Sequence, residues 1–174
     1  MEPKIVDKEE IILVGFSFFG DPFAESGGWT EGNEIGRLWS RFEAYLAAHP
    51  DRIKHLKSRT EALEVHVETE ETAARGHREV FVGVEVDELE DVPVEVLVKV
   101  LPPARYAVFS LVGEQITSDW SKIMDEWMTG EHDKAVKYVY RFVDDDHMIF
   151  EMHDLGIVPG ETMVIEVNYE RVKK

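Results

Sequence analysis

The sequence of 174 residues contains no cysteine. This absence excludes disulfides, thiol catalysis and metal sites built from thiolates. The chain also lacks an apolar run near the roughly 18 residues that a membrane-spanning helix needs. Its first ten residues do not have the basic-then-apolar order of a signal peptide. We therefore expect a cytoplasmic protein that does not bind membranes.

Basic residues are scarce. The chain has 19 Lys and Arg against 36 Asp and Glu, which gives a formal net charge of −17. Such a surface repels phosphate groups, and no basic cluster is dense enough to release counterions locally. We expect no direct contact with nucleic acid. The charge instead favours a cationic ligand or a basic protein partner, although solubility alone also explains it.

Enzyme motifs are also missing. The sequence has no Gly-x-Ser-x-Gly, no phosphate-binding glycine loop and no histidine pair at the spacing of a zinc site. His147 and His153 lie six residues apart in one predicted strand, and we interpret them as surface residues. The prediction is no metal and no cofactor.

Hydrophobic periodicity predicts one α+β domain over residues 1–174. Apolar residues at spacings of three and four predict amphipathic helices at 34–48 and 115–129. A loop with several glycines, residues 21–32, precedes the first helix. Apolar runs and alternating patterns predict the strands 10–20, 63–70, 80–87, 94–101, 105–113, 138–143, 148–153 and 163–169.

Three pairs of short segments resemble each other in the same order along the chain. They predict a duplicated β-α-β-β unit with halves of about 1–92 and 93–174. Each half would be an antiparallel sheet with one helix, and the two sheets would pair about a pseudo-twofold axis around a central ligand cleft. The pairs are 35–41 with 116–122 and 82–87 with 163–168, both at an offset of 81 residues, and 16–20 with 109–113 at an offset of 93.

Carboxylates recur at alternate positions of the predicted strands. Because successive side chains of a strand point to opposite faces, residues two apart share a face. We expect these acids on the face turned away from the helices, where they either meet solvent or line a ligand site. The sets are Glu64, His66 and Glu68; Phe81, Gly83, Glu85 and Asp87; and Ile149, Glu151 and His153.

Several strings, in this order and spacing, resemble the GyrI-like small-molecule-binding family, the effector-binding domain of bacterial multidrug-sensing transcription activators. They span nearly the whole chain, and the chain resembles a stand-alone member without the DNA-binding region. The pattern departs at His153 and at Leu63-Glu64, where the family often has tyrosine and Tyr-Gly. The strings are residues 2–6, 35–42, 81–87, 104–109 and 150–154.

The resemblance implies a domain that binds lipophilic, often cationic aromatic compounds, as in multidrug recognition or sequestration. It also implies that Glu151 lies within an aromatic-lined pocket. A carboxylate removed from water needs compensation, and an organic cation supplies it while stacking on aromatic rings. The candidate ligand-binding residues are Glu151, Glu85, Trp29, Trp39, Tyr106, Trp120, Trp127, Tyr138 and Tyr140. A large apolar residue on an amphipathic helix is more often part of the core than a ligand contact, and the helical tryptophans fit that interpretation, whereas Trp29 on the loop fits a lid.

Two alternatives stay open. Some relatives resemble hydrolases of cyclopropane-containing genotoxic compounds. In that interpretation Glu151, with Glu85 or Tyr106, acts as a general acid or base. The chain could also report a bound compound by contacting another protein. The sequence fits both a monomer and a homodimer.

Overall fold

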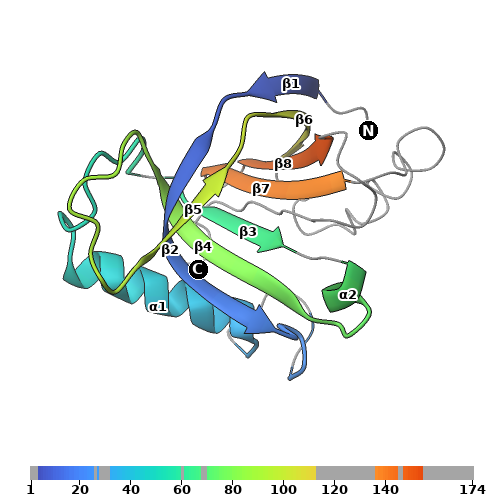
Figure 1. Cartoon of the computed structure of the whole chain (residues 1–174), viewed down its shortest axis with the longest axis horizontal. Coiled ribbons are helices and arrows are strands. Elements are labelled where there is room, and N and C mark those ends of the chain that lie inside the picture. The colour runs from blue at the N-terminus through green and yellow to red at the C-terminus, as the bar shows by residue number, and fades with distance from the viewer. Residues whose placement is uncertain are drawn as a thin grey trace.

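The computed structural model describes residues 4–25, 27, 32–59, 61–67, 70–112, 136–144 and 147–154. Residues 104–112, 136–144 and 147–154 are described here by their strand positions. The described chain is an α+β fold with antiparallel strands (Figure 1). No helix in these ranges is long and apolar enough to cross a membrane.

All eight described strands join one antiparallel sheet in the order β1-β6-β8-β7-β3-β4-β2-β5. Helix α1 (Glu34–Ala48) follows β2, and the one-turn helix α2 (Glu70–Ala73) connects β3 to β4. The strands are β1 (Lys4–Lys8), β2 (Ile11–Gly20), β3 (Leu63–Val67), β4 (Arg78–Val86), β5 (Leu97–Leu101), β6 (Ala104–Val112), β7 (Val136–Asp144) and β8 (His147–Asp154).

Two short links force this sheet to roll up. β1 forms one edge of the sheet, whereas β2 lies next to the other edge, and only Glu9 and Glu10 join them. Six strand spacings in a flat sheet would separate β1 and β2 by about 29 Å. The three residue steps of the link reach at most about 11 Å. Pro102 and Pro103 impose the same condition on β5 and β6, so the sheet has an inner and an outer face.

The inner face carries an apolar core. Its members come from β2, β3, β4 and β5, and Val6 on the opposite edge strand β1 packs against them. β1 forms one edge of the sheet and β5 the other, so this packing of Val6 is expected only if the sheet is rolled up. The buried members are Ile11, Leu13, Leu63, Val65, Phe81 and Leu101, with Val6 and Val67 partly buried.

Helix α1 covers the outer face of β2 and β4 (Figure 1). Its apolar stripe of Ile35, Leu38, Trp39 and Phe42 is buried. The Phe42 ring meets Phe16 of β2 edge to face, with centroids 5.6 Å apart. Phe16 therefore marks the outer face of β2, and its neighbours in sequence mark the inner face.

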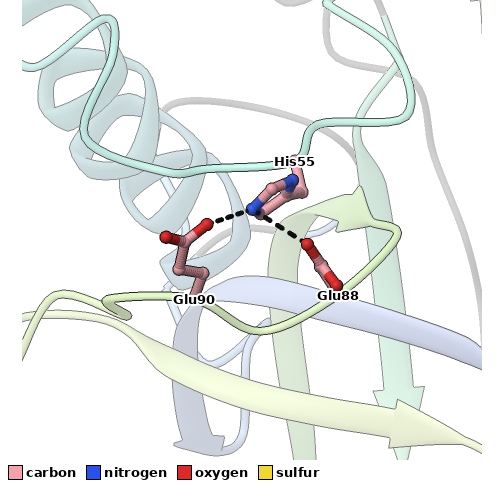
Figure 2. Close-up of side chains that lie close together, drawn as sticks. All are labelled: His55, Glu88 and Glu90. Carbon is pink, nitrogen blue, oxygen red and sulfur yellow. Dashed lines mark hydrogen bonds and ion pairs between the residues drawn. The ribbon is translucent and has the colours of Figure 1, made fainter.

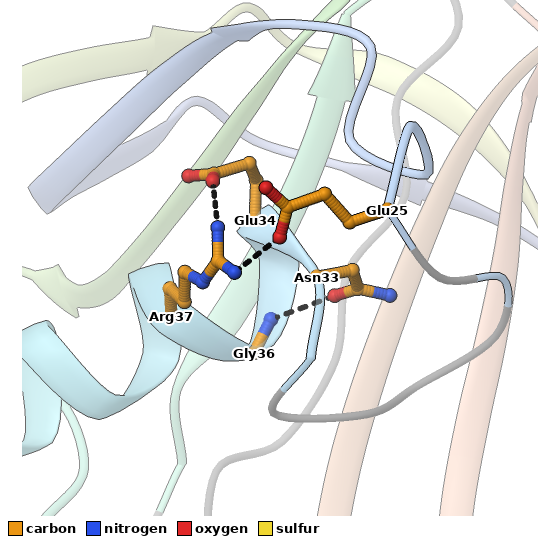
Figure 3. A network of polar contacts seen from close by, with 5 residues as sticks. All are labelled: Glu25, Asn33, Glu34, Gly36 and Arg37. Carbon is orange, nitrogen blue, oxygen red and sulfur yellow. Dashed lines mark hydrogen bonds and ion pairs between the residues drawn. The ribbon is translucent and has the colours of Figure 1, made fainter.

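Polar contacts fix the start of α1 (Figure 3). The Asn33 side chain caps the helix by accepting a hydrogen bond from the Gly36 backbone N–H at 3.1 Å. The Arg37 guanidinium bonds Glu34 Oε1 at 2.5 Å and also pairs with Glu25 from the preceding loop. These contacts tie the loop to the first turn of the helix.

The sequence predicted α1 with the bounds that the structure shows, and most strand bounds within three residues. It missed β1, and it ended the strand 63–70 at residue 70, which is the first residue of α2, whereas β3 ends at Val67. The predicted helix 115–129 and strand 163–169 lie outside the described residues. The prediction of two sheets differs from the structure, because β3 and β7 pair edge to edge and make the sheet continuous. This pairing hides the backbone groups of two strand edges.

The strand order has an internal symmetry. Exchanging β1, β2, β3 and β4 with β5, β6, β7 and β8 reproduces the same order read from the other edge. β1 and β5 have the same length and lie 93 positions apart in the chain. The pairing agrees: Lys4 lies opposite Val108, and the positions that correspond to them, Leu97 and Gly15, also lie opposite one another. In this order the counterpart of β4 is β8, rather than the segment 163–168 that the sequence comparison matched to it.

Candidate functional site

Strand register places Glu151 on the inner face of the sheet. Glu151 on β8 lies opposite Val139 on β7 and Val108 on β6. Val139 in turn lies opposite Val65 on β3, and Val65 lies opposite Phe81 on β4. Paired residues of neighbouring antiparallel strands share a face. Glu151 therefore occupies the same row, on the same face, as the buried core residues Val65 and Phe81.

Two other predicted site residues share this face. Tyr106 on β6 lies opposite Val6 of β1, and Glu85 on β4 lies opposite Leu13 of β2. Glu85 is 14% exposed, and its carboxylate accepts a hydrogen bond from Lys57 Nζ at 2.6 Å. Glu85 thus already has a counter-ion, near the end of its strand.

The positions of Tyr138 and Tyr140 belong to the outer face. They lie opposite Met152 and Phe150 of β8, one step out of phase with Glu151. Tyr140 also lies opposite Glu64 of β3, whose side chain contacts α1. The structure does not bring these two tyrosines to the face of Glu151.

Trp39 lies on the outer side of the sheet, in a buried polar group. Its indole Nε1 donates to Glu64 Oε2 at 2.5 Å, and His66 Nε2 lies 2.6 Å from Glu64 Oε1. Trp39 is 2% exposed, Glu64 0% and His66 4%. A buried carboxylate is tolerated when donors surround it, and these two rings supply them. Trp39 and Glu151 therefore belong to opposite faces of the sheet.

This arrangement corrects one prediction. Glu64 and His66 were expected on the face turned away from the helices, but they lie opposite Val82 and Val80, on the face that α1 covers. Alternation within β3 was predicted correctly. Its phase relative to β4 depends on the register, which no pattern inside the strand specifies.

The three remaining tryptophans of the predicted site, Trp29, Trp120 and Trp127, lie outside the described residues. The predicted site residues that lie within the described ranges are therefore Glu151, Glu85, Tyr106, Trp39, Tyr138 and Tyr140.

Sequence reasoning missed a polar cluster on the inner face. Lys99 Nζ donates to Glu79 Oε2 at 2.9 Å, and Ser17 Oγ donates to Glu79 Oε1 at 2.9 Å. The Lys99 ammonium also lies 5.5 Å from the centre of the Phe81 ring. The side chains of Lys99 and Glu79 are 18% and 30% exposed, so the pair lies between solvent and the core. Only the register brings these four residues, from three strands, together.

The glycines of β2 and β4 allow the two strands and the Phe81 ring to approach closely in this region. Gly15 lies opposite Gly83, and a Cβ on Gly83 would stand 2.7 Å from Phe81 Cε1 and from the Val14 carbonyl oxygen. A Cβ on Gly15 would stand 1.9 Å from the Val82 carbonyl oxygen. Side chains at these positions would force the strands apart.

His55, Glu88 and Glu90 form a separate cluster, at the surface (Figure 2). His55 Nε2 lies 3.2 Å from Glu88 Oε1 and closer to Glu90 Oε2. The hydrogen bond that the Glu90 carboxylate accepts from His55 raises the pKa of His55, and the negative charge of Glu88 also raises it. Among the described residues this is the one group whose three ligand atoms, within 4.8 Å of one another, could hold a metal ion. All three residues are exposed, and exposed acidic groups of this kind commonly carry none.

A surface hollow nearby is lined by Asp51, Arg52, Lys54, Asp91 and Val92. Its lining is mixed in charge and contains no aromatic ring. It includes no predicted site residue, and it does not offer the apolar walls that a lipophilic ligand needs.

Comparison with known proteins agrees with this fold. A family model described as "Cass2: Integron-associated effector binding protein" matches residues 4–166. A search of curated proteins found no match.

Solved structures of similar fold cover most of the chain at low sequence identity. SAV2435 bound to tetraphenylphosphonium has a TM-score of 0.63 at 16% identity, covering 88% of this chain and 94% of that one. A putative bacterial transcription regulation protein from Staphylococcus aureus MU50 has a TM-score of 0.62 at 15% identity, covering 90% and 99%. The integron cassette protein VCH_CASS2, from the mobile metagenome of Vibrio cholerae, has a TM-score of 0.54 at 16% identity, covering 87% and 95%.

Proposed function

Because the chain belongs to the Cass2 family of integron-associated effector binding proteins, we propose that it binds lipophilic cationic aromatic molecules on the inner face of its sheet. Effector binding means small-molecule binding in general. We further propose that the ligand is a cation. The observation that supports a cationic ligand is the strand register, in which Glu151 belongs to one row with the buried Val65 and Phe81.

The physical argument rests on compensation of charge. A carboxylate surrounded by apolar groups is costly in free energy unless a donor or a cation accompanies it. A delocalised organic cation gives up water more easily than a small ion and adds contacts to aromatic rings, each worth about 0.5–2 kcal/mol. A structural neighbour, SAV2435, is bound to tetraphenylphosphonium, which is a cation of this class. Tyr106, on the same face as Glu151, is the aromatic residue that we propose for the site.

The register also places two basic residues near the proposed counter-ion. Lys137 and Arg141 on β7 each lie two positions from Val139, and both are therefore diagonal neighbours of Glu151 on the inner face. An internal cation competes with a cationic ligand for the same carboxylate. We propose that this competition limits affinity, which makes Arg141→Gln an informative companion to a change at Glu151.

The symmetry of the strand order supports a duplicated origin for the two halves and a single site between them. The sequence offset of 93 matches Phe16 of β2 to Phe109 of β6. Phe16 lies opposite Val82, and Phe109 lies opposite Phe150, so Val82 of β4 corresponds to Phe150 of β8. The counterpart of Glu151 is then Gly83, which has no side chain and lies under Phe81. Only one half supplies a carboxylate at this position, so we expect the site around Glu151 to bind one ligand per chain.

Titration of tryptophan fluorescence tests the proposal, with tetraphenylphosphonium as the cation and a neutral polycyclic compound for comparison. Glu151→Gln should weaken cation binding about tenfold or more and leave the neutral compound almost unaffected, since roughly 1.4 kcal/mol of charge interaction is lost. Glu64→Gln is the matched control, because that acid lies on the opposite face. Equal losses in both variants, or no binding of any cation by the wild type, would contradict the proposal.

The comparisons give no support to the alternative of a cyclopropane hydrolase. The two functions differ in one measurement. A binding protein takes up at most one equivalent of a cyclopropane-bearing compound per site and releases it unchanged, whereas a hydrolase converts many equivalents into product.

A further inference from the structure

The polar cluster of Lys99, Glu79, Ser17 and Phe81 has the composition of a cation-binding site that the ammonium group of Lys99 already occupies. Organic ammonium groups are recognised by a carboxylate together with the face of an aromatic ring. Here the carboxylate is Glu79, the ring is Phe81, and the bound cation is the ammonium of Lys99, 2.9 Å from Glu79 Oε2 and 5.5 Å from the ring centre.

The other contacts of Glu79 show that the carboxylate is held in position. Ser17 Oγ donates to the second carboxylate oxygen at 2.9 Å. Glu79 therefore keeps one partner, on a neighbouring strand, when Lys99 moves away. Phe81 is 1% exposed and fixed within the inner core. The acid and the ring thus belong to the rigid sheet, whereas the cation is the end of a flexible chain on the edge strand β5.

We propose that Glu79, Ser17 and Phe81 form a second cation-binding site on the inner face, specific for substituted ammonium groups, and that Lys99 occupies it as a tethered competitor. A ligand cation takes the place of the Lys99 ammonium, which then swings into solvent. No bond forms or breaks. Phe81 and Glu151 belong to one row but lie three strands apart along the sheet, and this site shares no residue with the one proposed around Glu151.

The occupancy of the site by Lys99 determines how strongly it competes with a ligand. If Lys99 fills the site in about nine-tenths of molecules, a ligand meets an empty site in the remaining tenth, and its apparent affinity falls about tenfold. A half-buried ion pair over a ring, with 18% and 30% of the two side chains exposed, is compatible with an occupancy of this order. The site is therefore weak in the wild type and becomes visible when the competitor is removed.

The test is isothermal titration of the full chain with benzyltrimethylammonium. Lys99→Met removes the ammonium but keeps an apolar stem over Phe81. This variant should bind the probe about tenfold more tightly at this site than the wild type. Lys99→Arg keeps the charge and should behave as the wild type. Lys54→Ala, which makes the same change in net charge on the outer surface, should show no gain.

The double variant Lys99→Met with Glu79→Gln should lose the gain, because the carboxylate is then missing. A gain that survives this change, or a folded Lys99→Met protein that binds as the wild type does, would overturn the proposal. Repeating the titration in Glu151→Gln separates the two sites. A persistent gain from Lys99→Met in that background is expected. If Glu151→Gln leaves all cation binding unchanged while the gain remains, the function proposed around Glu151 fails and the second site stands.

Discussion

At the scale of single residues, the buried Glu64 carboxylate shows why one acid of the sheet need not face a ligand. Like Glu151, Glu64 is followed two positions later by a histidine, yet its two oxygens are satisfied by Trp39 and His66 under α1. Strand alternation could predict that Glu64 and Leu63 point to opposite faces. It could not predict which face is which, because this depends on pairing with β4, distant in sequence.

Trp39→Phe tests the structural role of this group. It keeps an aromatic ring in the core but leaves Glu64 without one donor, so the free energy of unfolding should fall by about 1–3 kcal/mol. Urea denaturation measures the change. Adding Glu64→Leu to Trp39→Phe should restore part of the loss, because the unsatisfied carboxylate is then removed. Simple additivity of the two changes would show that the hydrogen bond is unimportant.

His55 gives the chain a pH-dependent contact at its surface. Its carboxylate partners raise its pKa above the ordinary value of 6.5. Because the pKa of His55 is higher in the folded state, protonated His55 stabilises the folded protein at pH values below the pKa of the unfolded state. This stabilisation is lost as the pH rises through the pKa of the folded state. An NMR titration should therefore find a His55 pKa above 6.5 that falls in Glu90→Gln. A pKa at or below 6.5 would rule out the pairing.

At the scale of elements, local patterns predicted α1 and most of the strands, whereas the order and register of the strands depend on long-range pairing. The stripe of Ile35, Leu38, Trp39 and Phe42 together with the Asn33 cap is complete within sixteen consecutive residues. β1 was missed because five residues with mixed polarity have no diagnostic pattern of their own. Its strand character comes from pairing with β6, about a hundred positions away.

Gly83→Ala tests the close approach of β2 and β4. The added Cβ would meet both the Val14 carbonyl oxygen and the Phe81 ring at 2.7 Å, which is too short for a normal contact. Overpacking of this kind costs typically about 1–3 kcal/mol. Gly27→Ala is the matched control, since nothing lies within 4 Å of a Cβ there. Thermal unfolding of the two variants gives the comparison, and equal melting temperatures would contradict the strand geometry.

At the scale of the whole molecule, the net charge of −17 acts on the rate of binding. A field of one sign attracts cations over several ångströms and is screened by salt, with a Debye length of about 10 Å at 0.1 M. Association of tetraphenylphosphonium should therefore slow as ionic strength rises, while dissociation changes little. Stopped-flow fluorescence separates the two rates. An effect confined to dissociation would assign the salt dependence to the site itself.

The two-residue links Glu9-Glu10 and Pro102-Pro103 have a consequence for the two halves of the chain. They carry β1 of the first half into a pairing with β6 of the second, and β5 of the second half into a pairing with β2 of the first. Each half thus lends its partner an edge strand, as two subunits do in a domain-swapped dimer. A half expressed alone lacks a strand that it needs, and it can obtain one only from a second copy. This exchange of edge strands matches the symmetry of the strand order, in which β1 and β5 hold equivalent positions at opposite edges of the sheet.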